Sequence, residues 1–180
     1  MPMKISVLLS EKKREIAKTW FDLIVETYPQ DTANFLKTQK NRFGNPVGHT
    51  ISEGIEVVLE ELSGEMDFAR ISKYLDNIIR IRAIQDFTPS QAVGFIFLLK
   101  KVIREELFNE IHANHLFDEL LVIESKIDQL ANISFDMYIA CREKIYKLKA
   151  NELRNRTSRI LKMSNMFKEA EVEEKDTAGF

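Results

Sequence analysis

The chain contains few of the residues that break helices or cross-link chains. Its 180 residues include one cysteine, four prolines and six glycines. A single cysteine excludes an internal disulfide framework and is typical of a reducing compartment, and we interpret Cys141 as a small buried apolar residue. Because prolines and glycines supply most tight turns, their scarcity predicts an all-α protein.

Long apolar runs and a strong charge of one sign are also missing. No stretch approaches the roughly 18 uncharged apolar residues of a membrane span, and the N-terminal segment MPMKISVLLSEKK lacks the cleavage site of a signal peptide. The formal net charge of -2 gives no global attraction to nucleic acid or to anionic lipid. We therefore expect a cytoplasmic protein that does not associate with membranes.

Apolar residues recur at helical spacing along most of the first half of the chain. SEKKREIAKTWFDLIVETYP predicts an amphipathic helix that ends at Pro29, and DTANFLKT predicts a short one. NRFGNPVGHT is typical of a loop, with Pro46 in the first turn of a helix that Gly64 closes. Asp67 is the expected N-cap of a further helix, which ends near Asp86.

The clearest helix start lies in FTPSQAVGFIFLLKK, at residues 87–101. Thr88 is an N-cap, Pro89 takes the first helical position, and Gln91 completes a capping box with Thr88. The next eight residues are apolar apart from Gly94, which predicts a central helix packed on both flanks, with Gly94 allowing a close neighbour. A filled core is the default, and a pocket for an apolar ligand is the alternative. That pocket is expected at Trp20, Phe95, Leu99 and Tyr138.

A second long helix is predicted in the C-terminal half. From Asp118 to Lys168 there is no proline or glycine, which allows about 50 residues of continuous helix, whereas Lys149 to Arg159 contains few apolar residues and must project or pair with another chain. We expect three parts: a helical domain at 1–135, an extended dimerisation or signal helix at 136–168, and a disordered acidic tail at 169–180. The predicted pairing seam recurs at three- and four-residue steps: Phe135, Tyr138, Cys141, Ile145 and Leu148.

The residues offer little for catalysis or for metal binding. His112 and His115 are three residues apart, but no further histidine or cysteine pair accompanies them, so we interpret them as the end of a helix. For His49 a turn role is favoured over a ligand role. The acidic residues lie beside lysines and arginines, as on solvated faces, and no glycine-rich phosphate loop is present. We expect no enzyme activity, no metal and no cofactor.

A basic run near the C-terminus keeps a third function open. We interpret it as the solvated surface of a projecting helix, and contact with phosphates, as in a nucleic-acid adaptor, is the minority hypothesis. Two acidic residues, Glu143 and Glu152, stand in this run against eight basic ones: Arg142, Lys144, Lys147, Lys149, Arg154, Arg156, Arg159 and Lys162.

The chain contains, in this order, REIAKTWFDLIVETYP, RFGNPVGHTISEGI, FTPSQAVGFIFLLKKVIREEL and FDMYIACREKIYKLKANE. Together these segments resemble the N-terminal domain of the RsbR-type co-antagonists of RsbT, over roughly residues 10–150. The most specific pieces are NPVGHT and TPSQAVGFIFLLKK. The resemblance implies a globin-like helical bundle without haem, which dimerises through its terminal helices and passes a signal along a projecting C-terminal helix to an output module.

The resemblance implies that haem is absent. The residues predict the same, because no histidine lies in an apolar mid-helix setting. Since only a dozen residues follow Lys168, we expect the output module, a kinase or a STAS-type regulator, to be a separate protein. The leading hypothesis is a non-catalytic sensor module that acts as a homodimer in bacterial signalling and stress-response regulation. A binder of a fatty acid or a similar apolar ligand is the alternative.

Overall fold

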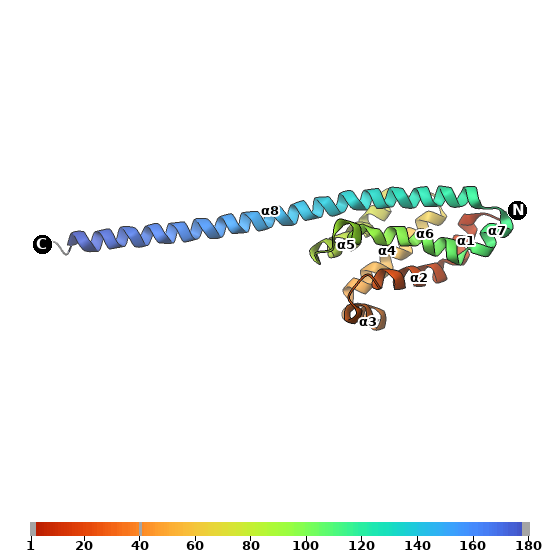
Figure 1. Ribbon diagram of the computed structural model, residues 1–180, viewed down its shortest axis with the longest axis horizontal. Helices are drawn as coiled ribbons and strands as arrows, with labels where there is room; N and C mark the ends of the chain where they lie inside the picture. Colours follow the sequence, from red (N-terminus) through yellow and green to blue (C-terminus); the bar gives the residue numbers. More distant parts are fainter. Residues whose placement is uncertain (1–2, 40, 178–180) are drawn as a thin grey trace. The chain divides into compact units, whose positions relative to one another are not determined.

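The computed structural model describes residues 3–39 and 41–177, with side chains up to residue 163. The regular structure of these residues is entirely α-helical, which confirms the predicted fold class (Figure 1). The helices are α1 (Ile5–Glu11), α2 (Lys13–Val25), α3 (Gln30–Thr38), α4 (Pro46–Ser63), α5 (Phe68–Ile84), α6 (Pro89–Glu106), α7 (Phe108–Asn114) and α8 (Phe117–Thr177).

The chain divides into two compact units, Met1–Cys141 and Arg142–Phe180. The first unit contains α1 to α7 together with the first part of α8, and the second contains the rest of α8. The sequence predicted a division six residues earlier, after residue 135.

The predicted helix caps are present. Thr88 and Gln91 form a capping box at the start of α6, and the Asp67 carboxylate accepts from the amides of Ala69 and Arg70 at the start of α5. At α4 the Asn45 side chain accepts from the Gly48 amide, 2.8 Å away, and its own amide group donates to the carbonyls of Leu36 and Gln39. A side chain at position 48 would collide with Asn45, which explains the glycine in NPVGHT.

One hydrophobic core holds the first unit together. Trp20 of α2 and Phe95 of α6 are among its largest members, and each is 1 % exposed. α1 adds Ile5, Leu8 and Leu9 to the same core, although its sequence did not predict a helix. α4 lies close to α5, where Gly54 leaves room for the end of the Ile78 side chain.

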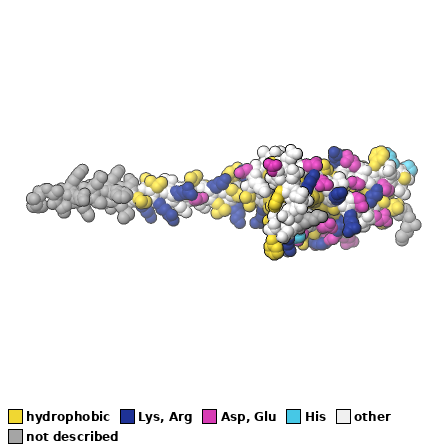
Figure 2. Space-filling view, turned by 90° about the horizontal axis from the view of Figure 1, so that it is seen from below, with side chains coloured by type: hydrophobic (Ala, Val, Ile, Leu, Met, Phe, Trp, Pro, Cys, Tyr) yellow, Lys and Arg dark blue, Asp and Glu magenta, His cyan; other side chains and the backbone are white. Residues whose placement is uncertain are grey.

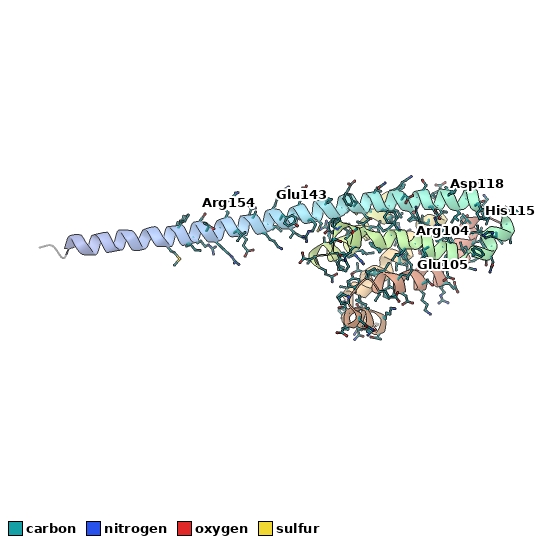
Figure 3. All side chains as sticks on the ribbon, viewed as in Figure 1. Arg104, Glu105, His115, Asp118, Glu143 and Arg154 are labelled. Carbon is teal, nitrogen blue, oxygen red and sulfur yellow. The ribbon has the colours of Figure 1, made fainter. Side chains whose placement is uncertain are left out.

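The first part of α8 runs antiparallel to α6 (Figure 1). Two ion pairs fix this register, because Arg104 pairs with Glu124 at 2.5 Å and Lys100 pairs with Asp128 at 2.6 Å. Moving back four residues along α6, from Arg104 to Lys100, thus corresponds to moving forward four residues along α8, as in antiparallel helices. In Figure 3 Arg104 is labelled on α6, beside the stretch of α8 that begins near Asp118.

α6 differs in two respects from the predicted helix that neighbours enclose on every side. Its faces with Ala92, Phe95 and Leu99 are buried, but the Phe97 side chain is 48 % exposed. Gly94 also has a different role from the close approach that was expected, since a Cβ there would meet nothing within 4 Å. The open space beside Gly94 belongs to a groove that is described below.

The second unit is helical through Thr177. The expected break-free helix is therefore confirmed, and it includes residues 169–177, for which the sequence predicted disorder, while residues 178–180 lie outside the described part of the chain. No proline or glycine interrupts this stretch before Gly179, which is consistent with its helical backbone. From residue 146 to residue 163 the side chains are exposed.

Candidate functional site

The most unusual residue of the first unit is Arg82, in the last turn of α5. Its side chain is 0 % exposed. Arginine is almost never fully buried without an acidic partner, because removing its charge from water costs several kcal/mol. Within the described residues no carboxylate forms an ion pair with it. This burial therefore needs another explanation.

Aromatic rings take the place of an acidic partner. The central guanidinium carbon of Arg82 lies 4.4 Å from the centre of the Phe87 ring, 5.1 Å from that of Tyr28 and 5.2 Å from that of Phe95. Each distance is within the range of a cation–π contact. We call Arg82 with these three rings the guanidinium cage.

The hydrogen bonds of Arg82 are incomplete. Nη2 donates to the Thr27 hydroxyl at 2.6 Å and to the Gln91 carbonyl at 3.3 Å. Nε and Nη1 have no hydrogen-bond partner among the described residues, and neither does the buried hydroxyl of Tyr28. The cage thus holds buried donors without a well-aligned hydrogen bond, although the Tyr28 oxygen lies close enough to interact with the guanidinium.

Burial also shifts the protonation equilibria in the cage. It lowers the pKa of Arg82, with the nearby Tyr28 oxygen acting in the opposite direction. Burial raises the pKa of the Tyr28 phenol, and the guanidinium opposes that shift. An added negative charge beside Arg82 would oppose the first shift and stabilise the charged guanidinium.

The turn between α5 and α6 positions the cage. Asp86 adopts a left-handed conformation with φ of 58°, and the Phe87 amide donates to the Arg82 carbonyl at 3.2 Å, as in a Schellman helix end. This turn places the Phe87 ring against the guanidinium. Because Arg82 lies in the last turn of α5, the helix dipole also favours its positive charge.

α8 contributes to the cage through Tyr138. This side chain is 3 % exposed, and its hydroxyl donates a short hydrogen bond to the Phe87 carbonyl. Phe87, whose ring covers Arg82, is thus hydrogen-bonded directly to α8. We call this hydrogen bond the Tyr138 latch.

The structure brings most of the predicted pocket residues together around the cage. Trp20 stacks on Phe95 with a centroid distance of 6.3 Å, and its indole nitrogen donates to the Phe95 carbonyl at 2.8 Å. Phe95 is one of the three rings of the cage. The Tyr138 hydroxyl donates to the carbonyl of Phe87, whose ring lies closest to Arg82. Leu99 lies one turn beyond Phe95 on α6 and is fully buried.

Sequence reasoning missed Arg82, which was not among the predicted site residues. The spacing nevertheless contained a signal. Arg82 follows Ile78 by four residues and Ile79 by three, and Leu75 precedes the same two isoleucines by three and four residues. All four therefore share one helical face, and the first three are core residues. A basic residue on an apolar face is the pattern that identifies a buried charge.

An apolar groove lies on the surface where α6 faces α8. It has a volume of about 550 Å³, and Phe97 and Phe135 on its two sides are 48 % and 47 % exposed. Val93, Gly94 and Ala131 are also among its lining residues. Large aromatic side chains on both sides of one groove form an apolar surface of the kind that binds proteins.

The residues of the predicted pairing seam differ in exposure. Phe135 lines the groove, whereas Tyr138 is buried inside its own chain by the latch. Cys141 and Ile145 are partly buried, and Leu148 is 61 % exposed. Phe135 is therefore the member of this set in the first unit that presents an exposed aromatic ring.

The histidines form no metal site in the part of the chain that the structure describes. His112 and His115 lie at the end of α7, as predicted, and the His112 ring packs against Phe108 and Phe117. His49 Nε2 lies 3.0 Å from Glu53 Oε1, one turn further along α4. None of the described helices has the length and hydropathy that crossing a bilayer requires.

Comparison with protein families decides the identity. Residues 14–153 match the family described as the RsbT co-antagonist protein rsbRD N-terminal domain. The chain belongs to this family. It is therefore an RsbR-type regulatory domain, as its sequence motifs indicated. Searches of curated proteins and of solved structures found no match.

Proposed function

We propose that this RsbR-type domain is a non-catalytic, haem-free sensor module that acts in the cytoplasm as a homodimer. Its signal starts at the guanidinium cage and reaches α8 through the Tyr138 latch. A separate output protein, a kinase or a STAS-type regulator, then responds to α8.

The latch is the observation that carries this proposal. Phe87 is at once the ring closest to Arg82 and the residue whose carbonyl accepts the Tyr138 hydroxyl. A change in the cage that displaces Phe87 must therefore break or move a hydrogen bond of α8. Packed helices respond to such changes by discrete shifts, which is how small local changes produce larger ones.

The apolar groove supports the homodimer. An isologous dimer would bury Phe97 and Phe135 of each chain against the other chain, and aromatic rings are enriched in the centres of such interfaces. Light scattering coupled to size-exclusion chromatography tests this at micromolar concentration. We expect the unmodified chain to be a dimer and Phe135→Asp to be a monomer.

Leu121→Asp is the matched control, because Leu121 is 63 % exposed on α8 and does not line the groove. It should remain a dimer. A stable monomer of the unmodified chain, or equal dissociation of both variants, would contradict an interface at the groove.

The unpartnered donors of the cage favour a second candidate function. An apolar ligand with a carboxylate, such as a fatty acid, would give Nε and Nη1 of Arg82 the acceptor that they lack. Phe87 is partly exposed and lies outside any helix, so its displacement offers an entry path. Native mass spectrometry of gently extracted protein should show a bound mass that Arg82→Met loses. A pure apo mass for the unmodified protein would argue for a filled core.

A further inference from the structure

The second unit has an apolar stripe whose side chains are exposed, with the Arg142 guanidinium lying 4.9 Å from the centre of the Tyr146 ring at the start of the stripe. Tyr146, Ala150, Leu153, Thr157 and Ile160 follow one another at alternating steps of four and three residues, so they lie along one face of α8. Tyr146, Leu153 and Ile160 are 56 %, 64 % and 67 % exposed. Large residues alternate with small ones, as in a surface that accepts the side chains of another helix.

Basic residues border this stripe on both sides. Helical geometry places Lys147 and Arg154 along one edge, and Lys149 and Arg156 along the other. All four are exposed, and Figure 2 shows basic and apolar side chains side by side on this stretch, where Figure 3 labels Arg154. We call these residues, together with the stripe, the basic-flanked stripe.

Two of the four flanking basic residues form ion pairs with acidic residues of the same helix. Arg156 pairs with Glu152 at 2.6 Å, and Lys147 lies 3.7 Å from Glu143. Both are exposed pairs within one helix, and such pairs contribute little. Lys149 on one edge and Arg154 on the other have no ion pair among the described residues, so each edge of the stripe keeps a positive charge.

We propose that the basic-flanked stripe is the docking surface for an amphipathic helix of another protein, with acidic residues on both sides of its apolar face. This inference deepens the proposed function and rests on it, because it specifies the chemistry of the output protein. The apolar stripe would supply the buried contact, and the flanking charges would select the partner and its register.

A second copy of this chain supplies only half of what the surface requires. Residues 142–163 of a second copy have a matching apolar stripe, but their basic edges would repel the basic edges of the first in parallel and in antiparallel pairing. The acidic segment at residues 169–176 has the right charge, but Ala170 and Val172 are its apolar residues, too few to cover the stripe.

Nucleic acid fits the charge but not the stripe. Phosphate contacts would use the lysines and arginines and leave Leu153 and Ile160 exposed to water. Exposed apolar residues at regular helical steps are explained by a helix partner and have no role on a phosphate backbone.

Binding of designed helical peptides to the full chain tests the proposal. The probe peptide has three heptads with leucine at both core positions and glutamate at both flanking positions, and its twin has lysine in place of each glutamate. Fluorescence anisotropy at low salt should show binding of the acidic peptide and none of the basic twin. The double variant Lys149→Glu with Arg156→Glu should weaken the acidic peptide at least tenfold and bind the basic twin more tightly than the unmodified chain does.

The matched control is Lys144→Glu with Lys162→Glu. It makes the same charge change on the opposite face of the helix, where both side chains are exposed. It should stay within threefold of the unmodified chain, and circular dichroism should show equal helicity for all variants. Equal weakening by both double variants would overturn the proposal, because net charge would then explain the binding.

Three further results would also overturn it. They are no binding of the acidic peptide, tighter binding of a random DNA duplex than of the peptide, and dissociation of the dimer by Leu153→Asp, which would show that a second copy occupies the stripe. The proposed dimer is judged separately with Phe135→Asp. A monomeric chain that still binds the peptide contradicts the dimer alone, and a dimer that does not bind the peptide contradicts the docking surface alone.

Discussion

Arg82 is held in the core mainly by aromatic rings. Each ring contributes about 1–2 kcal/mol when the contact is shielded from water, while removing an ion from water costs several kcal/mol. Two nitrogen atoms gain no hydrogen bond in return. The guanidinium therefore contributes little to folding, which is consistent with a role in binding or signalling.

Two substitutions at Arg82 separate the charge from the volume. Arg82→Met keeps most of the volume and removes the charge, so its free energy of unfolding should stay within about 1 kcal/mol of the unmodified value or exceed it. Arg82→Ala removes the volume as well and should cost about 3 kcal/mol through the cavity that it leaves. Urea denaturation measures both. A loss above about 3 kcal/mol for Arg82→Met would show that the guanidinium supports the fold.

At the scale of helices, two glycines in helix interiors have opposite surroundings. Gly54 of α4 faces α5, where a Cβ would lie 2.5 Å from the end of the buried Ile78 side chain. Gly94 of α6 borders the open groove. The same substitution at the two positions thus tests whether α4 and α5 are packed as closely as the structure shows.

Gly94→Ala should raise the free energy of unfolding by about 0.5–1 kcal/mol, because alanine is the better helix former and meets no neighbour. Gly54→Ala gains the same propensity but crowds Ile78, and we expect a net loss of about 1 kcal/mol. Thermal and urea unfolding of both variants provide the measurement. Equal effects would mean that the contact between α4 and α5 is looser than described.

The sequence predicted those helices that have explicit ends. Thr88, Pro89 and Gln91 mark the start of α6 by side-chain chemistry that acts locally, and Gly64 and Asp67 mark two further ends in the same way. α1 was missed because its seven residues have no side-chain cap, and its three buried residues become significant only against the core.

The candidate site was predicted only in part, because sequence patterns are local and the site is formed by residues from distant helices. Trp20, Phe95 and Tyr138 were named because large aromatic residues on helices form cores, and they do converge near one place. The place of Phe87 and the groove beside Gly94 depend on how distant helices meet, and no local pattern contains that information. Arg82 shares a helical face with core residues, but a charged residue within an apolar face is ordinarily assigned to the surface.

At the scale of the whole molecule, the two units differ in how they are stabilised. The buried residues of the described chain end at Tyr138, so the core lies entirely within Met1–Cys141. The second unit is one helix whose side chains are exposed from residue 146 to residue 163, and an isolated helix gains most of its stability from packing against something else.

A chain that ends at Cys141 should therefore keep the unfolding temperature of the full chain to within about 5 °C, a shift that corresponds to roughly 1–2 kcal/mol in a domain of this size. Circular dichroism during heating measures it. A fall of more than about 10 °C, or the loss of a cooperative transition, would show that residues beyond Cys141 stabilise the core.

The coupling between the cage and α8 is the central claim, and hydrogen–deuterium exchange of Tyr138→Phe tests it most directly. Removing the hydroxyl leaves the Phe87 carbonyl without its partner from α8, at a cost of about 1–2 kcal/mol. Exchange should become roughly 5–30 times faster at residues 85–91 and at residues 134–141 together. Tyr146→Phe, which removes the hydroxyl of an exposed side chain that accepts a hydrogen bond from Arg142 of the same helix, should leave both segments unchanged. Unchanged exchange in Tyr138→Phe, or a change confined to one of the two segments, would contradict a signal path through the latch.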